Sequence, residues 1–142
     1  MRILAVDHGS KRIGLAISDE LKMIAQPLEF VAADSWESVL SRLLRIIEEK
    51  QIELILVGLP RNMNGTYGPA AARVQEFVTK LQPAVTVPVK TWDERLTSAQ
   101  ANRVLLAGNV RRQKRKEKVD QMAAAILLQS YLDSLHAQSH EP

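Results

Sequence analysis

Residues Arg2 to Ser18, RILAVDHGSKRIGLAIS, specify two adjacent strands and so the beginning of a sheet. The first apolar run ends at Asp7, and a continuous apolar run is typical of a central strand that is buried on both faces. The turn after Asp7 carries Gly9 and leads into a second apolar run that begins at Ile13. The stretch therefore predicts a β-hairpin whose first strand ends in a carboxylate.

Outward from this hairpin, apolar periodicity and turn residues predict seven more elements. In order, these are a strand near residues 28–31, a helix from Asp34 to about Ile47, a strand over residues 54–57, a helix from Pro69 to about Leu81, a strand over residues 87–92, a helix from Thr97 to about Gly108, and a helix from about Lys118 to Leu135. Glu37 follows Asp34 at the spacing of a capping box. Proline suits the first turn of a helix, as at Pro69, whereas Pro88 indicates an edge strand or a strand start.

The order of these elements predicts the fold. Early antiparallel strands followed by βαβ crossovers give an α/β protein with a mixed five-stranded sheet, in which the first three strands are antiparallel and helices cover the faces. A ribonuclease H-like fold has this arrangement. We expect residues 1–135 to form one domain and residues 136–142 to form a disordered tail.

The composition narrows the class of protein. The chain has 142 residues, of which 46% are hydrophobic and 25% charged, and it contains no cysteine. These values are ordinary for a soluble globular domain and exclude a disulfide framework and thiolate metal sites. The N-terminus enters a strand pattern without a signal peptide, and no apolar run is long enough to cross a membrane. We therefore expect a cytoplasmic protein with no membrane partner.

A basic block lies between Arg111 and Lys118, with six basic residues and one acidic residue. Because the whole chain carries a net charge of +3 and this block +5, the rest of the chain carries −2. We expect this segment to be a loop, and its charge favours a polyanion such as nucleic acid as partner. The alternative is a solvated loop without a partner.

Three acids stand at the ends of predicted elements. Asp7 ends a strand, Glu94 follows another strand within Asp93-Glu94-Arg95, and Asp120 lies in the first turn of the last helix. Each has a structural alternative: a turn cap for Asp7, a surface salt bridge for Glu94, and compensation of the helix dipole for Asp120. If the fold brings them together, they form a site for a cation.

A cluster of three carboxylates needs a positive partner. Two carboxylates 4 Å apart repel by about 4 kcal/mol at an effective dielectric constant near 20. Such a cluster either takes up protons or recruits a cation, and oxygen ligands favour Mg²⁺ or Mn²⁺. Gly9 would let a phosphate approach closely. The glycines at 9 and 14 do not make a P-loop, because Leu15-Ala16 stands where that motif needs Lys-Ser/Thr.

Four ordered motifs resemble the YqgF family, also called RuvX, whose members are often labelled Holliday junction resolvases. In this chain they read Val6-Asp7-His8-Gly9-Ser10-Lys11-Arg12-Ile13-Gly14-Leu15-Ala16, Val57-Gly58-Leu59-Pro60, Trp92-Asp93-Glu94-Arg95-Leu96-Thr97 and Lys118-Val119-Asp120-Gln121-Met122-Ala123-Ala124. The resemblance covers roughly residues 2–133. It implies a ribonuclease H-like nuclease that uses divalent metal and a link to maturation of the 5′ end of pre-16S rRNA.

The resemblance implies that Asp7, Glu94 and Asp120 are both metal ligands and catalytic residues, with Asp93 as the substitute for Glu94. We expect basic and strand-end residues to contact the phosphate backbone of the substrate. These are Gly9, Arg12, Asn62, Arg95, Arg111, Arg112, Lys114, Arg115 and Lys118. The loop with Asn62 has a simpler interpretation as a turn-rich connection. Trp36 and Trp92 are expected to be core residues rather than platforms on which bases stack.

Four functions compete at this point. The first is a nuclease that acts on a precursor of ribosomal RNA, in association with the ribosome. The second is a Holliday junction resolvase, which would need a homodimer to cut branched DNA symmetrically. The third is a non-catalytic nucleic-acid-binding protein that acts in transcription. An actin-like ATPase is disfavoured, because that class needs two such domains to enclose the nucleotide.

Overall fold

The computed structural model describes residues 1–9, 11–60, 68–93 and 112–139, and in the last range it describes side chains for residues 122–136 only. One five-stranded sheet has the order β3-β2-β1-β4-β5. The strands are β1 (Arg2–His8), β2 (Arg12–Ser18), β3 (Ala25–Ala32), β4 (Ile52–Leu59) and β5 (Val89–Asp93). β2 is antiparallel to β1 and β3, whereas β4 is parallel to β1 and β5. The predicted mixed sheet is confirmed.

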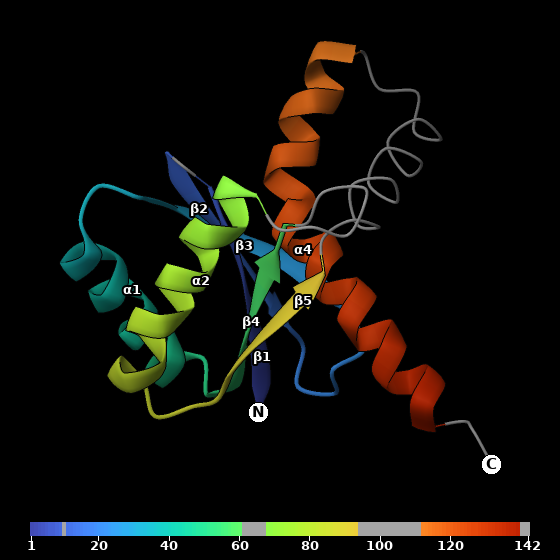
Figure 1. Ribbon diagram of the computed structural model, residues 1–142. Coiled ribbons are helices and arrows are strands. Elements are labelled where there is room, and N and C mark those ends of the chain that lie inside the picture. The colour runs from blue at the N-terminus through green and yellow to red at the C-terminus, as the bar shows by residue number, and fades with distance from the viewer. Residues whose placement is uncertain (10, 61–67, 94–111, 140–142) are drawn as a thin grey trace.

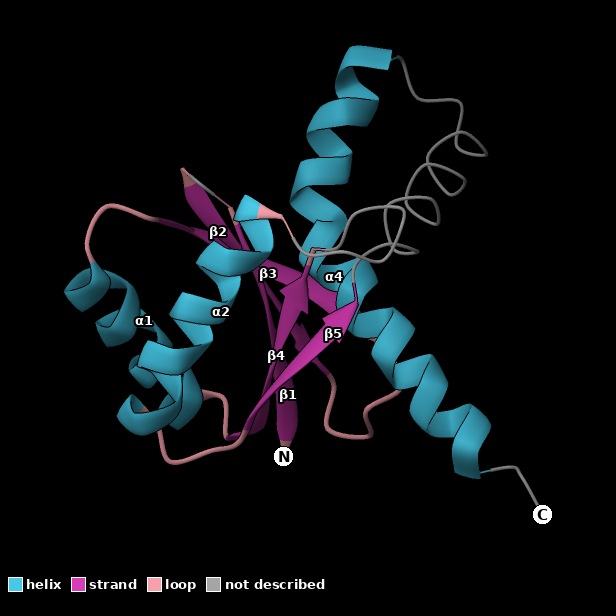
Figure 2. Ribbon diagram, in the orientation of Figure 1, coloured by secondary structure: helices cyan, strands magenta, loops and turns pink. Residues whose placement is uncertain are grey.

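Helices cover both faces of this sheet (Figures 1 and 2). The helices α1 (Trp36–Glu49) and α2 (Pro69–Leu81) pack on one face, and a single 3-10 turn, η1 (Gln82–Ala84), follows α2. The long helix α4 (Arg112–Ser139) packs on the other face. None of the helices in the described ranges is long and apolar enough to cross a bilayer.

Strand β1 lies at the centre of the sheet and contributes to two hydrophobic clusters. Leu4 and Val6 belong to the cluster beneath α1 and α2, whereas Ile3 and Ala5 belong to the cluster beneath α4. All four side chains are at most 2% exposed, which explains the continuous apolar run in the sequence. Because side chains alternate along a strand, each later residue of β1 can be assigned to one of these faces.

The cap of α1 differs from the predicted one. We expected Asp34 to begin this helix, but Ser35 is its N-cap, with an extended backbone and a side-chain oxygen that accepts a hydrogen bond from the Ser38 N–H at 3.2 Å. Serine and aspartate cap helices about equally well, so their preference alone does not choose between adjacent positions.

Other boundaries follow the sequence more closely. Helix α2 occupies Pro69–Leu81 as predicted, with the proline in its first turn. β5 is an edge strand that begins directly after Pro88, as the proline indicated. β3 is longer than the predicted run of residues 28–31, because its exposed edge alternates too weakly in hydropathy to reveal its full length. The predicted helix over residues 97–108 lies outside the described residues.

The basic segment was wrongly predicted to be a loop. The backbone is helical from Arg112, so residues 112–118 form the first turns of α4 and position 120 lies in its third turn rather than its first. These turns rise beyond the ends of the strands, where no sheet lies beneath them, so no apolar stripe is needed (Figure 1). Lysine, arginine and glutamine are nevertheless good helix formers, which explains why the helix continues. α4 also runs past Leu135, where we expected it to end.

Candidate functional site

Asp7 lies at the carboxyl end of the central strand. The parallel strands β1, β4 and β5 all end at this edge of the sheet, which is where α/β proteins commonly bind ligands. Asp7 alternates with Ile3 and Ala5, so its side chain lies on the α4 face of the sheet. It is half-buried, and its carboxylate forms no hydrogen bond or ion pair with any other residue in the described ranges. Asp7 thus places a carboxylate at the sheet edge where the parallel strands end.

Gly14 is the neighbour of Asp7 in the sheet. Gly14 lies on β2 and is paired with Asp7 of β1 on one side and with Phe30 of β3 on the other. A β-carbon at position 14 would lie 3.8 Å from the Asp7 β-carbon and 3.4 Å from Cε1 of Phe30. A methyl group would thus already contact both residues, so glycine at position 14 lets the Phe30 ring lie close to Asp7.

Gly9 is required by the turn that follows Asp7. Its N–H donates a hydrogen bond to the Arg12 carbonyl oxygen at 3.0 Å. A β-carbon at position 9 would lie only 2.6 Å from that same backbone oxygen, which cannot move away as a flexible side chain could. A larger residue would thus push the turn open. The role of Gly9 in phosphate binding stays a prediction.

Arg12 lies on the same face as Asp7. Its neighbour Ile13 belongs to the cluster beneath α1 and α2, so Arg12 and Gly14 take the opposite face. The Arg12 side chain is exposed, and its guanidinium carbon lies 4.4 Å from the centre of the Phe30 ring. This cation-π contact holds a positive charge on the face of the sheet that carries Asp7.

The last two residues of β5, Trp92 and Asp93, lie on opposite faces of the sheet. Trp92 packs on the α4 cluster, where its indole N–H donates to Ser130 Oγ at 3.3 Å and its ring meets Tyr131 edge-on. Asp93 is paired with Leu59, which packs against the cluster beneath α1 and α2. By alternation, Asp93 therefore lies on the opposite face from Asp7. Trp92 was expected in the core; it packs against the α4 cluster but is only partly buried.

Helix α4 places position 120 at the same end of the molecule as Asp7. Gln129 Oε1 accepts a hydrogen bond from the Ala25 N–H, and His136 Nε2 lies 2.9 Å from the Lys22 carbonyl oxygen. Both contacts are at the end of the sheet where β1 begins. The earlier turns of α4 therefore lie toward the end where β1 finishes. Position 120 is one helical turn before Ala124, which is buried against the sheet.

The remaining predicted site residues stay predictions. Glu94, Arg95, Asn62 and Arg111 lie outside the described residues. For Asp120, Arg112, Lys114, Arg115 and Lys118 the structure describes the helical backbone but not the side chains. Within the part of the chain whose side chains are described, no group of three or more His, Cys, Asp or Glu residues could hold a metal ion.

His8 lies on the face of the sheet opposite Asp7, and the sequence did not predict this separation of the two side chains. Its ring centre lies 4.8 Å from that of Phe77 on α2, and the residue borders a cavity between α1 and α2. Burial lowers the pKa of His8 below its ordinary value, and the positive charge of Arg73 adds to this shift, whereas a backbone hydrogen bond and the negative charge of Asp7 oppose it. The alternation of side chains along β1 was the signal that could have separated His8 from Asp7.

Comparisons with known proteins agree with this architecture. The RuvX family, described as "Holliday junction resolvase", matches residues 1–134. A protein of Desulforamulus reducens named "Putative pre-16S rRNA nuclease" is 48% identical over 134 residues, which cover 94% of this chain and 98% of that protein. A Bacillus subtilis protein of the same name is 46% identical over 138 residues, covering 96% of this chain and all of the other.

Solved structures of two resolvases share the fold. RuvC of Thermus thermophilus, in complex with a Holliday junction substrate, has a TM-score of 0.55 at 18% identity, over 99% of this chain and 96% of that chain. The fowlpox virus Holliday junction resolvase has a TM-score of 0.55 at 16% identity, over 94% of this chain and 99% of that chain. The ribonuclease H-like fold is thus confirmed. With the family match over almost its full length and close relatives of nearly the same size, this chain belongs to the RuvX family.

Proposed function

We propose that this chain is a divalent-metal-dependent nuclease that processes the 5′ end of pre-16S rRNA. Membership of a family whose curated relatives are named nucleases makes it a hydrolase of phosphodiester bonds. The observation that supports a metal-dependent reaction at this edge of the sheet is the half-buried carboxylate of Asp7, which forms no hydrogen bond or ion pair with the described side chains.

The metal site would be formed by Asp7, Glu94 and Asp120. The donor set is made of carboxylate oxygens, and the chain has no cysteine, which fits Mg²⁺ or Mn²⁺. The geometry of β5 supports Glu94 over Asp93, because Asp93 lies on the face opposite Asp7. A divalent cation bound there would supply positive charge to the scissile phosphate and lower the pKa of the attacking water.

The residues of this chain would then position the phosphodiester. Asp7 would hold the cation at the sheet edge, and Gly9 would let a phosphate approach the turn that follows Asp7. Arg12, held over the Phe30 ring, offers a guanidinium to a neighbouring phosphate. The basic first turns of α4 extend past the same edge and would contact further phosphates without reading sequence.

Two substrates remain in competition. The names of the curated relatives support a ribosomal RNA precursor, whereas the family description supports a four-way DNA junction. Symmetrical cleavage of a junction needs two active sites related by a dyad, and therefore a dimer. A single active site is sufficient to process an RNA end.

The two activities are separated by matched substrates. We expect the purified protein with Mn²⁺ to cleave an RNA that spans the 5′ end of 16S rRNA at least about tenfold faster than a four-way DNA junction. Light scattering on the same preparation should give the mass of a monomer. Faster cleavage of the junction, by a protein with the mass of a dimer, would instead establish the resolvase activity. Equal inactivity on both substrates with Mg²⁺ and Mn²⁺ would contradict the proposed function.

A further inference from the structure

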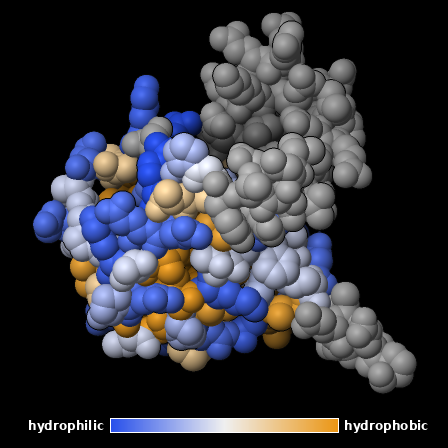
Figure 3. Space-filling model, in the orientation of Figure 1, coloured by the Kyte–Doolittle hydropathy of each residue, from blue (hydrophilic) through white to orange (hydrophobic). Residues whose placement is uncertain are grey.

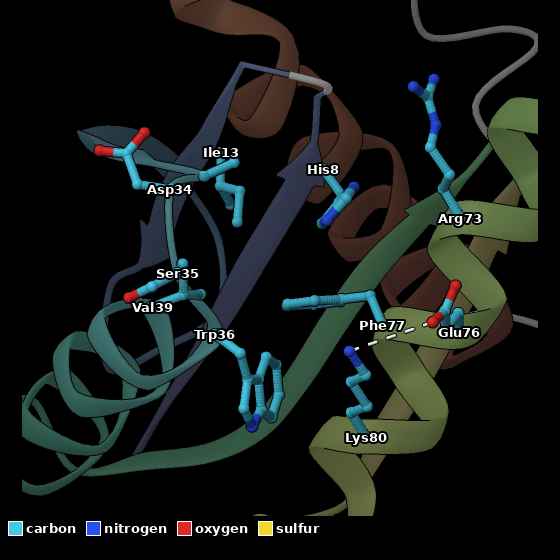
Figure 4. A pocket seen from close by; sticks show the side chains of 11 residues that line it. His8, Ile13, Asp34, Ser35, Trp36, Val39, Arg73, Glu76, Phe77 and Lys80 are labelled. Atoms are coloured by element: carbon cyan, nitrogen blue, oxygen red, sulfur yellow. Dashed lines mark ion pairs between the residues drawn. The ribbon is translucent and has the colours of Figure 1, made fainter.

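A cavity of about 230 Å³ lies on the face of the sheet opposite Asp7, between the beginning of α1 and the exposed side of α2 (Figure 4). The face seen in Figure 3 carries apolar atoms showing between polar side chains over these two helices. The cavity is smaller than the roughly 300–1,000 Å³ of pockets for drug-sized molecules. It therefore suits one small group.

Three rings from three different elements meet in this cavity. Phe77 of α2 is only 5% exposed, and it supports His8 of β1 at a ring-centre distance of 4.8 Å. Trp36 of α1 meets the same phenylalanine edge-on at 5.8 Å. His8 and Trp36 are half-buried, and both border the cavity. Half-exposed aromatic rings that are held by a buried one are suited to stacking on an unpaired base.

The charges around the cavity favour one phosphate rather than several. Arg73 and Lys80 on α2 contribute two positive charges, and Asp34 and Glu76 contribute two negative charges, so the rim is neutral overall. Lys80 forms an exposed ion pair with Glu76 at 4.0 Å and lies 5.8 Å from the Trp36 ring centre. A polyphosphate would be repelled by the two carboxylates. A base with a single phosphate near Arg73 fits this balance.

The position of Arg73 connects the cavity to the acidic edge. In Figure 4 Arg73 rises from α2 on the side of the cavity where β1 ends. Asp7 and His8 are consecutive residues of β1 with side chains on opposite faces. An RNA chain that passes across this edge from one face of the sheet to the other spans on the order of 10 Å, the distance between packed layers. A few nucleotides can cover that distance.

We propose that the cavity between α1 and α2 is a subsite for one unpaired nucleobase, stacked on Trp36 with its edge toward His8 and its phosphate at Arg73. The nucleotide has two sources with the same chemistry: a base of the RNA strand near the cleaved bond, or a free mononucleotide. The strand source rests on the proposed function, whereas the free-nucleotide source does not. Binding can be measured in EDTA, where metal-dependent cleavage does not occur.

The free-nucleotide arm uses the fluorescence of Trp36. Trp92→Phe leaves Trp36 as the only tryptophan, and phenylalanine keeps the ring that packs on Tyr131. We expect AMP, GMP, CMP or UMP to quench this fluorescence saturably at millimolar concentrations, whereas ribose 5-phosphate, which has no base, does not. Arg73→Ala should weaken the binding of the nucleotides severalfold. Arg45→Ala, an exposed arginine on α1 away from the cavity, is the matched control and should have no effect.

The strand arm uses fluorescence anisotropy with labelled single-stranded RNA. Trp36→Leu should reduce RNA affinity about tenfold, the loss expected for one stacked base, and circular dichroism confirms that the variant folds. Arg73→Ala provides a second variant that leaves the core untouched. If the variants weaken the binding of both mononucleotides and RNA, the cavity accepts a base from either source. If they weaken the binding of only one of these ligands, the cavity accepts a base from that source alone. The proposal is overturned if mononucleotides cause no saturable quenching, or a quenching that Arg73→Ala does not weaken, and if RNA affinity also responds to neither variant, whatever the outcome of the cleavage assay.

Discussion

Asp7→Asn is expected to lower kcat for metal-dependent RNA cleavage by about a hundredfold to a thousandfold, the loss typical when one charge-stabilising group is removed from an active site. Asparagine has nearly the same shape as aspartate but carries no charge, so it binds a divalent cation poorly. Because the Asp7 carboxylate makes no described hydrogen bond or ion pair, its replacement removes no described contact from the fold. Cleavage kinetics with saturating RNA and Mn²⁺ measure the effect.

The control for Asp7→Asn is RNA binding without metal. Affinity in EDTA should be unchanged, because the phosphate contacts come from other residues. Asp19→Asn offers a second comparison, since Asp19 caps the loop between β2 and β3 at the opposite end of the sheet. That variant should cleave at the wild-type rate. Wild-type cleavage by Asp7→Asn would remove this residue from the mechanism.

The second large effect concerns the basic beginning of α4. Replacing Arg111, Arg112, Lys114 and Arg115 with alanine should lower RNA affinity by at least about tenfold at moderate salt. Each lost contact with single-stranded nucleic acid reduces the slope of log affinity against log salt by about 0.7, so four losses reduce it by about 2 to 3. Alanine is a strong helix former, so the helical backbone should remain. Affinity measured at several salt concentrations gives this slope.

A charge-preserving variant separates charge from shape. Replacing Arg111, Arg112 and Arg115 with lysine should keep both the affinity and the salt slope nearly at their wild-type values, because backbone phosphates are recognised mainly as charges. An unchanged slope in the alanine variant would mean that this segment does not touch phosphate.

The sequence predicted the centre of the fold better than its edges. β1 is buried on both faces, so its continuous apolar run predicted both that it is a strand and that it lies at the centre of the sheet. α2 has a proline at its first residue and a buried stripe of Ala71, Val74, Phe77 and Leu81, and its limits were predicted correctly. β3 lies at the sheet edge with Gln26 and Pro27 exposed, so its start was hidden. Periodicity reports on burial and is weak where burial is incomplete.

The same reasoning explains the error at α4. Between residues 112 and 118 the helix extends past the sheet and has no apolar face, so periodicity indicated a loop. Helix propensity was the remaining signal, and it favoured a helix. The charge of the segment was read correctly, because charge does not depend on what packs beneath it.

Within the site, strand ends were more predictable than faces. The sequence placed Asp7 at the end of a central strand, as the structure does. It did not separate Asp7 from His8, nor predict that residues from β1, α1 and α2 enclose a cavity behind the acidic edge. Trp36 and Phe77 were assigned to apolar helix stripes, and only the relative placement of the two helices brings them to the same cavity.

The central claim is that Asp7, Glu94 and Asp120 share a divalent cation. Calorimetric titration of Mn²⁺ in the presence of an uncleavable RNA analogue tests it most directly, with the wild type compared with Asp7→Asn, Glu94→Gln, Asp120→Asn and Asp93→Asn. We predict Mn²⁺ uptake by the wild type and by Asp93→Asn, and loss of that uptake in each of the other three variants. Unchanged uptake in any one of those three, or no uptake by the wild type, would contradict the shared site.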